Sequence, residues 1–462
     1  MVVGCTLLAV WTGGGHLTDG IVDTADFEDY CAGSAWWSGA TDGPWPRRRS
    51  VLAGMAAGLL TIPLGIVDGL AAAGVIGFAG VAAGVLLAGR AILGPVAGSS
   101  AAVLTVALAP LAILPRHLSF YPAIVGVFSL AAGLVACAAR SRARTPWLLG
   151  CLGVAICPLI DLRGIVWGGA LGLVMLAAAL RRPERLRLAA VLLGTVALSW
   201  GAGQWAYPGN AASLEEQAWQ AIHLQQFAAQ QAQAGSVLPV LETWTVWGRS
   251  PLLELPAGLL TVAQIADQAP ARSGVYAMSD SQLQWWTVPM LVSAALVAWR
   301  LRRDGWGLVV LLGIGAPFWL AWSDGVRFGH AELRQVALGA PGTALLVGAG
   351  IGALWPTARR WWLAPAVLAV LVLPQMPLGP DADWRRPTPS RQQHHIAAKL
   401  QLAAHGHIPR ARLGGACVRA LVRDRDAGRP AGSRLYGPLT GPTGSPPGGP
   451  GPMGRPVRGT GQ

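Results

Sequence analysis

The sequence predicts an all-α protein that crosses a membrane many times. Of its 462 residues, 53% are hydrophobic and only 12% are charged, and the mean hydropathy of +0.46 is high for a soluble domain. Up to Gly379 the chain divides into long apolar runs separated by short links that carry arginine. Because a spanning helix needs about 20 mostly apolar residues, these runs predict transmembrane helices in a lipid bilayer.

Eleven spans account for the apolar runs. They cover roughly residues 1–13, 68–89, 91–114, 119–139, 147–160, 164–180, 187–206, 285–299, 305–323, 336–355 and 361–379. The first run is about 20 Å long as a helix, short of a hydrocarbon core of about 30 Å, so we expect the true start of this helix to lie upstream. The Asp161-Leu162-Arg163-Gly164 sequence interrupts 147–180, which predicts either one bent helix or two half-spans.

The links between the spans predict the orientation. Alternate links are basic, and these carry Arg90; Arg140, Arg142 and Arg144; Arg181, Arg182 and Arg185; Arg300, Arg302 and Arg303; and Arg359 and Arg360. The intervening segments are neutral or acidic. Since arginine stays on the cytoplasmic side, we expect a bacterial plasma (inner) membrane protein with its N-terminus in the cytoplasm and its C-terminus outside.

Two outer loops, 14–67 and 207–284, are too long to be plain connectors. In the first, residues 47–66 begin with three arginines and predict a helix lying flat at the outer interface. In the second, Ser213-Leu214-Glu215-Glu216 is a capping box that predicts a surface helix to about Ala234. The predicted transmembrane domain, 1–379, includes both loops.

The chain changes character after Gly379. We expect 380–430 to form a short outer segment, and 431–462, with ten Gly and seven Pro, to be disordered. Thirteen basic and four acidic residues after Gly379 supply +9 of the formal charge of +13. The high basicity is therefore mostly a property of the tail, and we expect no nucleic-acid partner.

The cysteines and glycines predict neither a metal site nor a bound cofactor. Six cysteines show no CxxC and no metal-ligand spacing, although a bridge between Cys31 and Cys417 stays open. No Gly-rich phosphate loop is present, which argues against a soluble nucleotide-linked donor.

The segment 19–31 carries the clearest chemical signal. It holds five carboxylates within eleven residues, directly after the first span on the predicted outer side. Such a cluster can bind a cation or a polar substrate, or supply a general base whose pKa its neighbours raise. A solvated acidic loop without function explains the composition equally well.

Asp26-Phe27-x-x-Tyr30, followed by small residues and an aromatic pair to Gly39, resembles the first outer loop of the GT-C glycosyltransferases. These include the protein O-mannosyltransferases, the aminoarabinose transferases and the polyprenyl-phosphomannose-dependent mannosyltransferases. The resemblance extends to the spans, the flat helix and the large later outer loop. It implies an inverting transfer of a hexose or pentose from a polyprenyl-phosphate donor to a glycan, lipid or protein acceptor outside the membrane.

The resemblance also implies roles for individual residues. Asp26 aligns with the catalytic base and Asp23 is the second candidate, while Glu28, Asp29 and Tyr30 are expected to bind substrate. The Asp-Glu pair typical of the O-mannosyltransferases is absent, unless Asp26 with Glu28 or Asp29 replaces it.

A leaving lipid phosphate needs arginine or histidine on the outer side. The candidates are Arg116, Arg163, Arg327 and His330. A local Asp161–Arg163 pair that ends a helix is the plain alternative for Arg163, and ordinary interfacial charge is the alternative for Arg327 and His330. A transporter, a lipid-linked sugar flippase or a noncatalytic relative of the GT-C enzymes are the competing functions.

Tryptophans near the ends of the spans predict an interfacial belt. Its members would include Trp147, Trp299, Trp306, Trp322 and Trp355.

Overall fold

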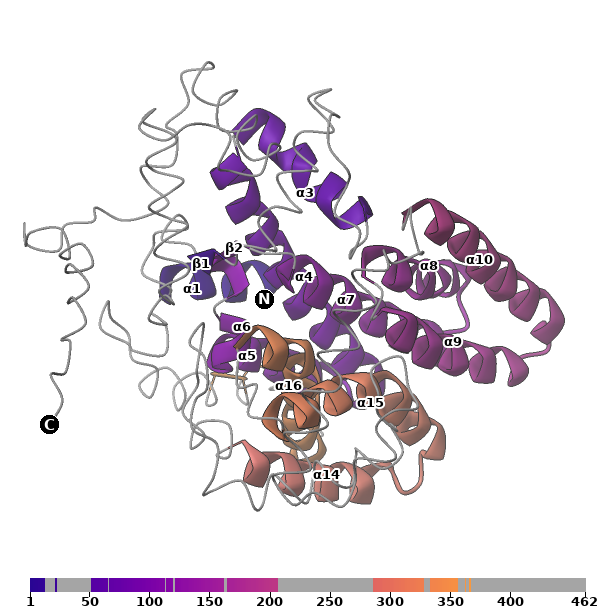
Figure 1. The fold of residues 1–462 in the computed structure, drawn as a ribbon. Coiled ribbons are helices and arrows are strands. Elements are labelled where there is room, and N and C mark those ends of the chain that lie inside the picture. Colours follow the sequence, from indigo (N-terminus) through magenta and orange to yellow (C-terminus); the bar gives the residue numbers. More distant parts are fainter. Residues whose placement is uncertain are drawn as a thin grey trace, which may run out of the picture.

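The protein forms a helical bundle with one short pair of strands (Figure 1). The computed structural model describes residues 1–12, 21–22, 51–64, 66–112, 114–118, 121–161, 164–206, 286–327, 333–355, 362 and 365–366. The described helices are α1 (Val2–Thr12), α3 (Val51–Leu64), α4 (Ile66–Leu93), α5 (Pro95–Ala107), α6 (Ala109–Ala112), the 3-10 turn η1 (Leu114–Arg116), α7 (Tyr121–Arg140), α8 (Arg144–Ile160), α9 (Gly164–Leu180), α10 (Arg185–Ala206), α14 (Thr287–Leu301), α15 (Gly305–Arg327) and α16 (Leu333–Leu354).

Five described helices contain a stretch long and apolar enough to span a membrane. These stretches are Ala72–Leu93, Tyr121–Arg140, Arg185–Ala202, Gly305–Trp322 and Ala337–Leu354. Four further apolar helices, α5, α8, α9 and most of α14, are shorter. A mainly helical fold with several helices that could span a membrane is therefore confirmed. The count of eleven spans stays a prediction, and the span at 361–379, the helix at 213–234 and the segments after 379 lie outside the described residues.

Two predictions from the sequence were wrong in detail. The predicted span 91–114 is two helices and a 3-10 turn, because α4 runs on to Leu93 and Gly94 then takes a φ of 96° before Pro95 starts α5. The fold is also not purely helical, since β1 (Ile21–Val22) pairs in parallel with β2 (His117–Leu118). The helix expected at 47–66 is present as α3, and its level in the membrane stays a prediction.

Small residues let the central helices approach closely. On the parallel pair α4 and α7, a Cβ added to Gly80 would lie only 3.1 Å from the carbonyl oxygen of Gly126, and Gly84 faces Ser129 and Gly133 just as tightly. Without a strong hydrophobic driving force between helices in lipid, backbone approach of this kind is a main source of association. The glycines at the contact between α4 and α7 are thus explained by this helix interface.

The helices differ in how much of their surface the bundle covers. α16 lies in the centre and is buried along most of its length. α10 instead exposes Leu186, Leu193, Leu198 and Trp200, beside α8 and α9 at the right of Figure 1. An apolar face this exposed fits contact with lipid tails.

Spanning helices that follow one another in the chain alternate in direction, which brings four of the predicted cytoplasmic links to one end. We call this the basic end, and it comprises Arg90 with Ala91, residues 140–144, 181–187 and 300–307. The opposite end, which we call the distal end, comprises β1, η1, β2, the start of α7, Asp161, and the junction between α15 and α16. The alternation predicted from arginine is confirmed for these links. Which end faces the cytoplasm stays a prediction.

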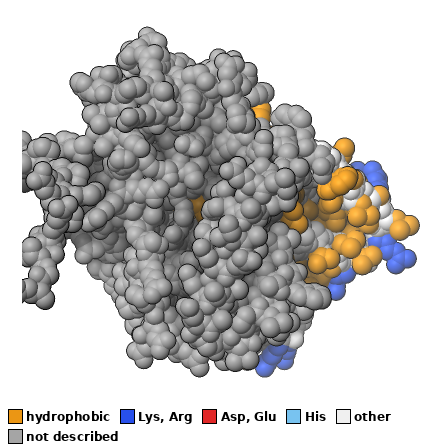
Figure 2. Space-filling view, in the orientation of Figure 1, with side chains coloured by type: hydrophobic (Ala, Val, Ile, Leu, Met, Phe, Trp, Pro, Cys, Tyr) orange, Lys and Arg blue, Asp and Glu red, His pale blue; other side chains and the backbone are white. Residues whose placement is uncertain are grey.

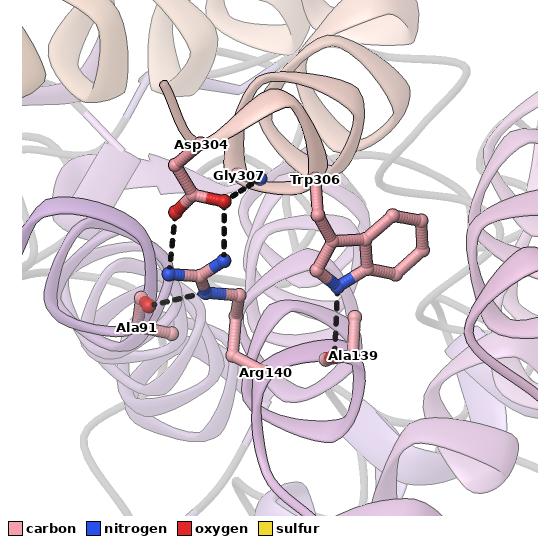
Figure 3. Close-up of polar contacts among 6 residues, drawn as sticks. All are labelled: Ala91, Ala139, Arg140, Asp304, Trp306 and Gly307. Atoms are coloured by element: carbon pink, nitrogen blue, oxygen red, sulfur yellow. Dashed lines mark hydrogen bonds and ion pairs between the residues drawn. The ribbon is translucent and has the colours of Figure 1, made fainter. Parts of the chain in front are cut away.

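Arg140 joins three helices at the basic end (Figure 3). Its Nη1 donates to Asp304 Oδ1 at 3.1 Å and its Nη2 lies 2.7 Å from Asp304 Oδ2, while its Nε donates to the Ala91 carbonyl at 3.3 Å. Asp304 also accepts the Gly307 N–H at 2.9 Å, which caps α15. One charged pair therefore holds the ends of α4 and α7 to the start of α15.

Tryptophans at the basic end are partly buried under arginine. Trp306 Nε1 donates to the Ala139 carbonyl at 3.1 Å, and the Arg181 guanidinium lies 4.7 Å from its ring centroid.

The predicted interfacial belt of tryptophans holds only in part. Trp147 is only 2% exposed, and Trp322 only 3%, so for these two the prediction of an interfacial belt was wrong. Both pack inside the bundle, whereas Trp299 and Trp355 are exposed as a belt requires.

Candidate functional site

Described backbone beside several sequence-predicted site residues lies at the distal end. Arg116 ends η1 and Arg327 ends α15, and for both the structure describes the backbone but not the side chain. The remaining predicted site residues lie outside the described residues. These are Asp23, Asp26, Glu28, Asp29, Tyr30, Arg163 and His330.

Strand pairing joins the residues directly before Asp23 to the residues directly after Arg116. Ile21 pairs with His117 and Val22 with Leu118. In the sequence, Asp23 follows directly after Val22, and Arg116 directly precedes His117. Two parts of the chain that are separated by about a hundred residues in sequence are therefore adjacent, and this proximity could not be read from either motif alone.

The segment carrying Arg116 is seated firmly on α4. A Cβ added to Gly74 would lie 3.0 Å from the carbonyl oxygen of Pro115 and 3.1 Å from that of Leu114, closer than most side chains tolerate. α1 packs on both α4 and η1. Glycine at position 74 thus permits the backbone approach that fixes η1 and β2 at the distal end.

Asp161 is the only charged residue among the buried side chains of the described part of the chain, at 5% exposed. It follows α8, where its N–H donates to the Cys157 carbonyl, and its own carbonyl accepts the Gly164 N–H at 2.8 Å as α9 begins. The two halves of 147–180 are therefore two separate helices. A buried carboxylate between membrane helices is typical of a functional or paired group. The predicted pairing with Arg163 is not tested.

Helix geometry sets the separation of this end from the basic end. α8 starts at Arg144 and has 17 residues, so Asp161 lies about 25 Å from the basic end at 1.5 Å per residue. α15 likewise runs from Gly305 at the basic end to Arg327. The backbone of Arg116 and of Arg327 thus lies at a different end from the arginines of the basic links.

Sequence reasoning missed a buried aromatic cluster next to the distal end. Trp167, in the first turn of α9, stacks on Phe128 with ring centroids 4.6 Å apart and meets Phe318 edge-on at 5.7 Å. Its Nε1 is buried and has no hydrogen-bond partner within the described residues. Trp167 lies in a Gly-rich apolar run, so the sequence holds no signal that distinguishes it from a lipid-facing residue.

No three His, Cys, Asp or Glu side chains come together as a metal site within the described ranges. The acidic segment 23–31 is outside these ranges, so the expectation of a metal-free site concerns residues that the structure does not describe.

No protein-family model and no curated protein shows a significant match to this chain. Among solved structures, the chain is similar to ArnT from Cupriavidus metallidurans in its apo state, at 13% sequence identity. The similarity covers 91% of this chain and 83% of that one, with a TM-score of 0.41. At this TM-score the two folds correspond only coarsely.

Proposed function

We propose that this protein is an integral membrane glycosyltransferase. In this proposal it transfers a sugar, with inversion, from a polyprenyl-phosphate-linked donor to an acceptor on the extracytoplasmic side of the membrane. The observation that carries the proposal is the pairing of β1 with β2 at the distal end, because β1 directly precedes Asp23 and β2 directly follows Arg116 in the chain.

The proposed chemistry needs one base and one phosphate-binding group. Asp26 takes the proton of the acceptor hydroxyl or amine, with Asp23 as the second candidate, and the lipid phosphate leaves from the opposite face of the sugar. Glu28, Asp29 and Tyr30 hold the sugar and the acceptor. Arg116, Arg163, Arg327 and His330 bind the departing phosphate through charge-assisted hydrogen bonds.

Three features of the described residues support this assignment of roles to the acidic and basic residues. Arg116 belongs to the segment that pairs beside Val22, the residue before Asp23. Asp161 is a buried acid at the same end. The apolar surface of α10 fits a membrane, where a lipid-linked donor resides.

The test is transfer of radiolabelled sugar from polyprenyl-phosphate lipids in membranes that contain the full chain. We expect Asp26→Asn to lower the transfer rate by about 10²–10⁴-fold, the usual contribution of a general base, with unchanged amounts of inserted protein. The matched control is Asp42→Asn, which removes a carboxylate of the same outer loop and should leave transfer unchanged.

Two outcomes would change the proposal. Unchanged transfer by Asp26→Asn would exclude Asp26 as the base and direct the same test to Asp23. No lipid-dependent transfer by the wild-type protein would contradict the glycosyltransferase function itself, and a carrier or a noncatalytic relative would then be favoured.

A further inference from the structure

The basic end carries far more positive charge than its internal contacts use. Its described links hold eleven arginines, at position 90 and within 140–144, 181–187 and 300–303, against two acids, Glu184 and Asp304, which gives +9. Asp304 is already paired with Arg140. Most of these guanidinium groups therefore face either solvent or a partner that is negatively charged.

Two of the basic links are fastened to each other. Arg182, in the turn between α9 and α10, donates through Nη2 to the Ala138 carbonyl at 2.5 Å and to the Ser141 carbonyl at the end of α7. Its guanidinium lies 4.8 Å from the ring centroid of the buried Trp147, in the first turn of α8. Arg182 thus fixes the α9–α10 turn on the α7–α8 link.

This junction concentrates like charges. Arg142 and Arg144 extend from the α7–α8 link, and Arg185 from the start of α10, and all three are exposed. Burial lowers the pKa of Arg182, and the positive charge of Arg142 lowers it further, with Glu184 acting in the opposite direction. Since Arg182 donates to the carbonyl of Ser141, the residue before Arg142, the two arginines are near neighbours whose like charges repel each other. A bound anion would relieve this repulsion.

The junction also lies at the border of an apolar surface. Leu186 is 81% exposed directly after Arg185, and Leu148 is 58% exposed one turn after Arg144. In Figure 2, basic side chains border the exposed apolar side chains in the region where Figure 1 shows α9 and α10. An anionic group that occurs at the border between lipid tails and water is the phosphate of a phospholipid headgroup.

We propose that Arg142, Arg144 and Arg185 form a binding site for an anionic phospholipid headgroup at the junction of the α7–α8 and α9–α10 links. Guanidinium groups match the geometry of phosphate oxygens and are more weakly hydrated than ammonium groups. Basic pockets between membrane helices are typical sites for such headgroups. The site is at the opposite end from the proposed sugar-transfer site, so the two proposals can fail independently.

The test measures retention of phosphatidylglycerol and phosphatidylcholine by the full-length protein in neutral detergent, using native mass spectrometry across a lipid titration. In the triple variant R142Q/R144Q/R185Q we expect the affinity for phosphatidylglycerol to fall roughly tenfold or more. The matched control R300Q/R302Q/R303Q removes the same charge from exposed arginines at another link and should keep the affinity within about threefold.

Several results would overturn the site. These are equal losses in the two triple variants, equal retention of phosphatidylcholine, or displacement of phosphatidylglycerol by millimolar inorganic phosphate, which would indicate a site for free phosphate. If the triple variant does not fold, the single variant R144Q tests the site, because Arg144 is exposed and its replacement should leave the fold intact. We then still expect a loss of affinity that is specific to phosphatidylglycerol.

Discussion

At the basic end of the bundle, side-chain hydrogen bonds and an ion pair join the links to one another, whereas at the distal end strand pairing and close backbone packing join segments that lie far apart in the sequence. Arg140 and Arg182 between them bind Ala91, Asp304 and two carbonyls near the end of α7. At the distal end, β1 pairs with β2 and η1 rests on α4. We interpret the basic end as the anchor of the bundle, and the distal end as the place for chemistry.

Both ends depend on the close pairing of α4 with α7, so the largest effect is expected from separating these helices. A side chain at Gly84 would collide with the carbonyl of Ser129. We predict that Gly84→Leu destabilises the fold by about 3 kcal/mol or more, because neither backbone can move without losing its neighbours. The measurement is the melting temperature and folded yield by fluorescence-detected size-exclusion chromatography.

The control for this substitution is Gly194→Leu on α10. Gly194 is exposed, and nothing lies within 4 Å of an added Cβ. Its melting temperature should match that of the wild-type protein. Equal melting temperatures for the two variants would show that the α4–α7 contact does not hold the ends together.

A second substitution acts on the basic end alone. Asp304→Ala removes both the bidentate pair with Arg140 and the cap on the Gly307 N–H. We predict a loss of about 1–2 kcal/mol, most of it from the cap, since the pair is partly exposed and screened by solvent. A double-mutant cycle with Arg140→Gln measures the pair itself. A coupling energy of zero would mean that the pair does not contribute to the anchor.

The pH dependence of stability tests the contribution of the Asp304 carboxylate to the basic end. The hydrogen bond from Arg140 is the main cause that lowers the pKa of Asp304 below its usual 3.8, and the Gly307 N–H and the charges of Arg140 and Arg181 act in the same direction. Because the pKa is lower in the folded state, the stabilisation is present above about pH 4 and is lost as the pH falls through the folded-state value. Melting temperatures measured between pH 3 and 6 should fall less in Asp304→Asn than in the wild-type protein.

Much of this fold can be predicted from the sequence because membrane helices obey simple rules. The apolar runs predict helices whose bounds agree with those of α7, α9, α10 and α15 to within a few residues. The alternation of arginine correctly grouped four links at one end. In lipid, the backbone hydrogen bonds must form within each helix, and arginine stays near the membrane surface. The length of an apolar run and the placement of arginine are therefore enough to predict the helices and the links that share one end.

Other features depend on contacts that are distant in sequence. The break at Gly94 follows from a glycine in the left-handed region before a proline, in a run where hydropathy alone predicts one helix. Trp147 is buried with the guanidinium of Arg182 over its ring, and Ile21 pairs with His117; in both cases the two residues lie far apart in the chain. For the candidate site, the sequence predicts which residues could act. Most of these residues lie outside the described part of the chain, so the distances between them stay untested.

The most direct test of the division between the two ends compares the same substitution at each. Asp26→Ala and Asp304→Ala should be assayed side by side for sugar transfer per folded molecule and for melting temperature. We predict that Asp26→Ala lowers transfer by about 10²–10⁴-fold at an unchanged melting temperature, and that Asp304→Ala lowers the melting temperature while transfer per folded molecule is retained. Parallel losses of both quantities in both variants, or full transfer by Asp26→Ala, would contradict the account.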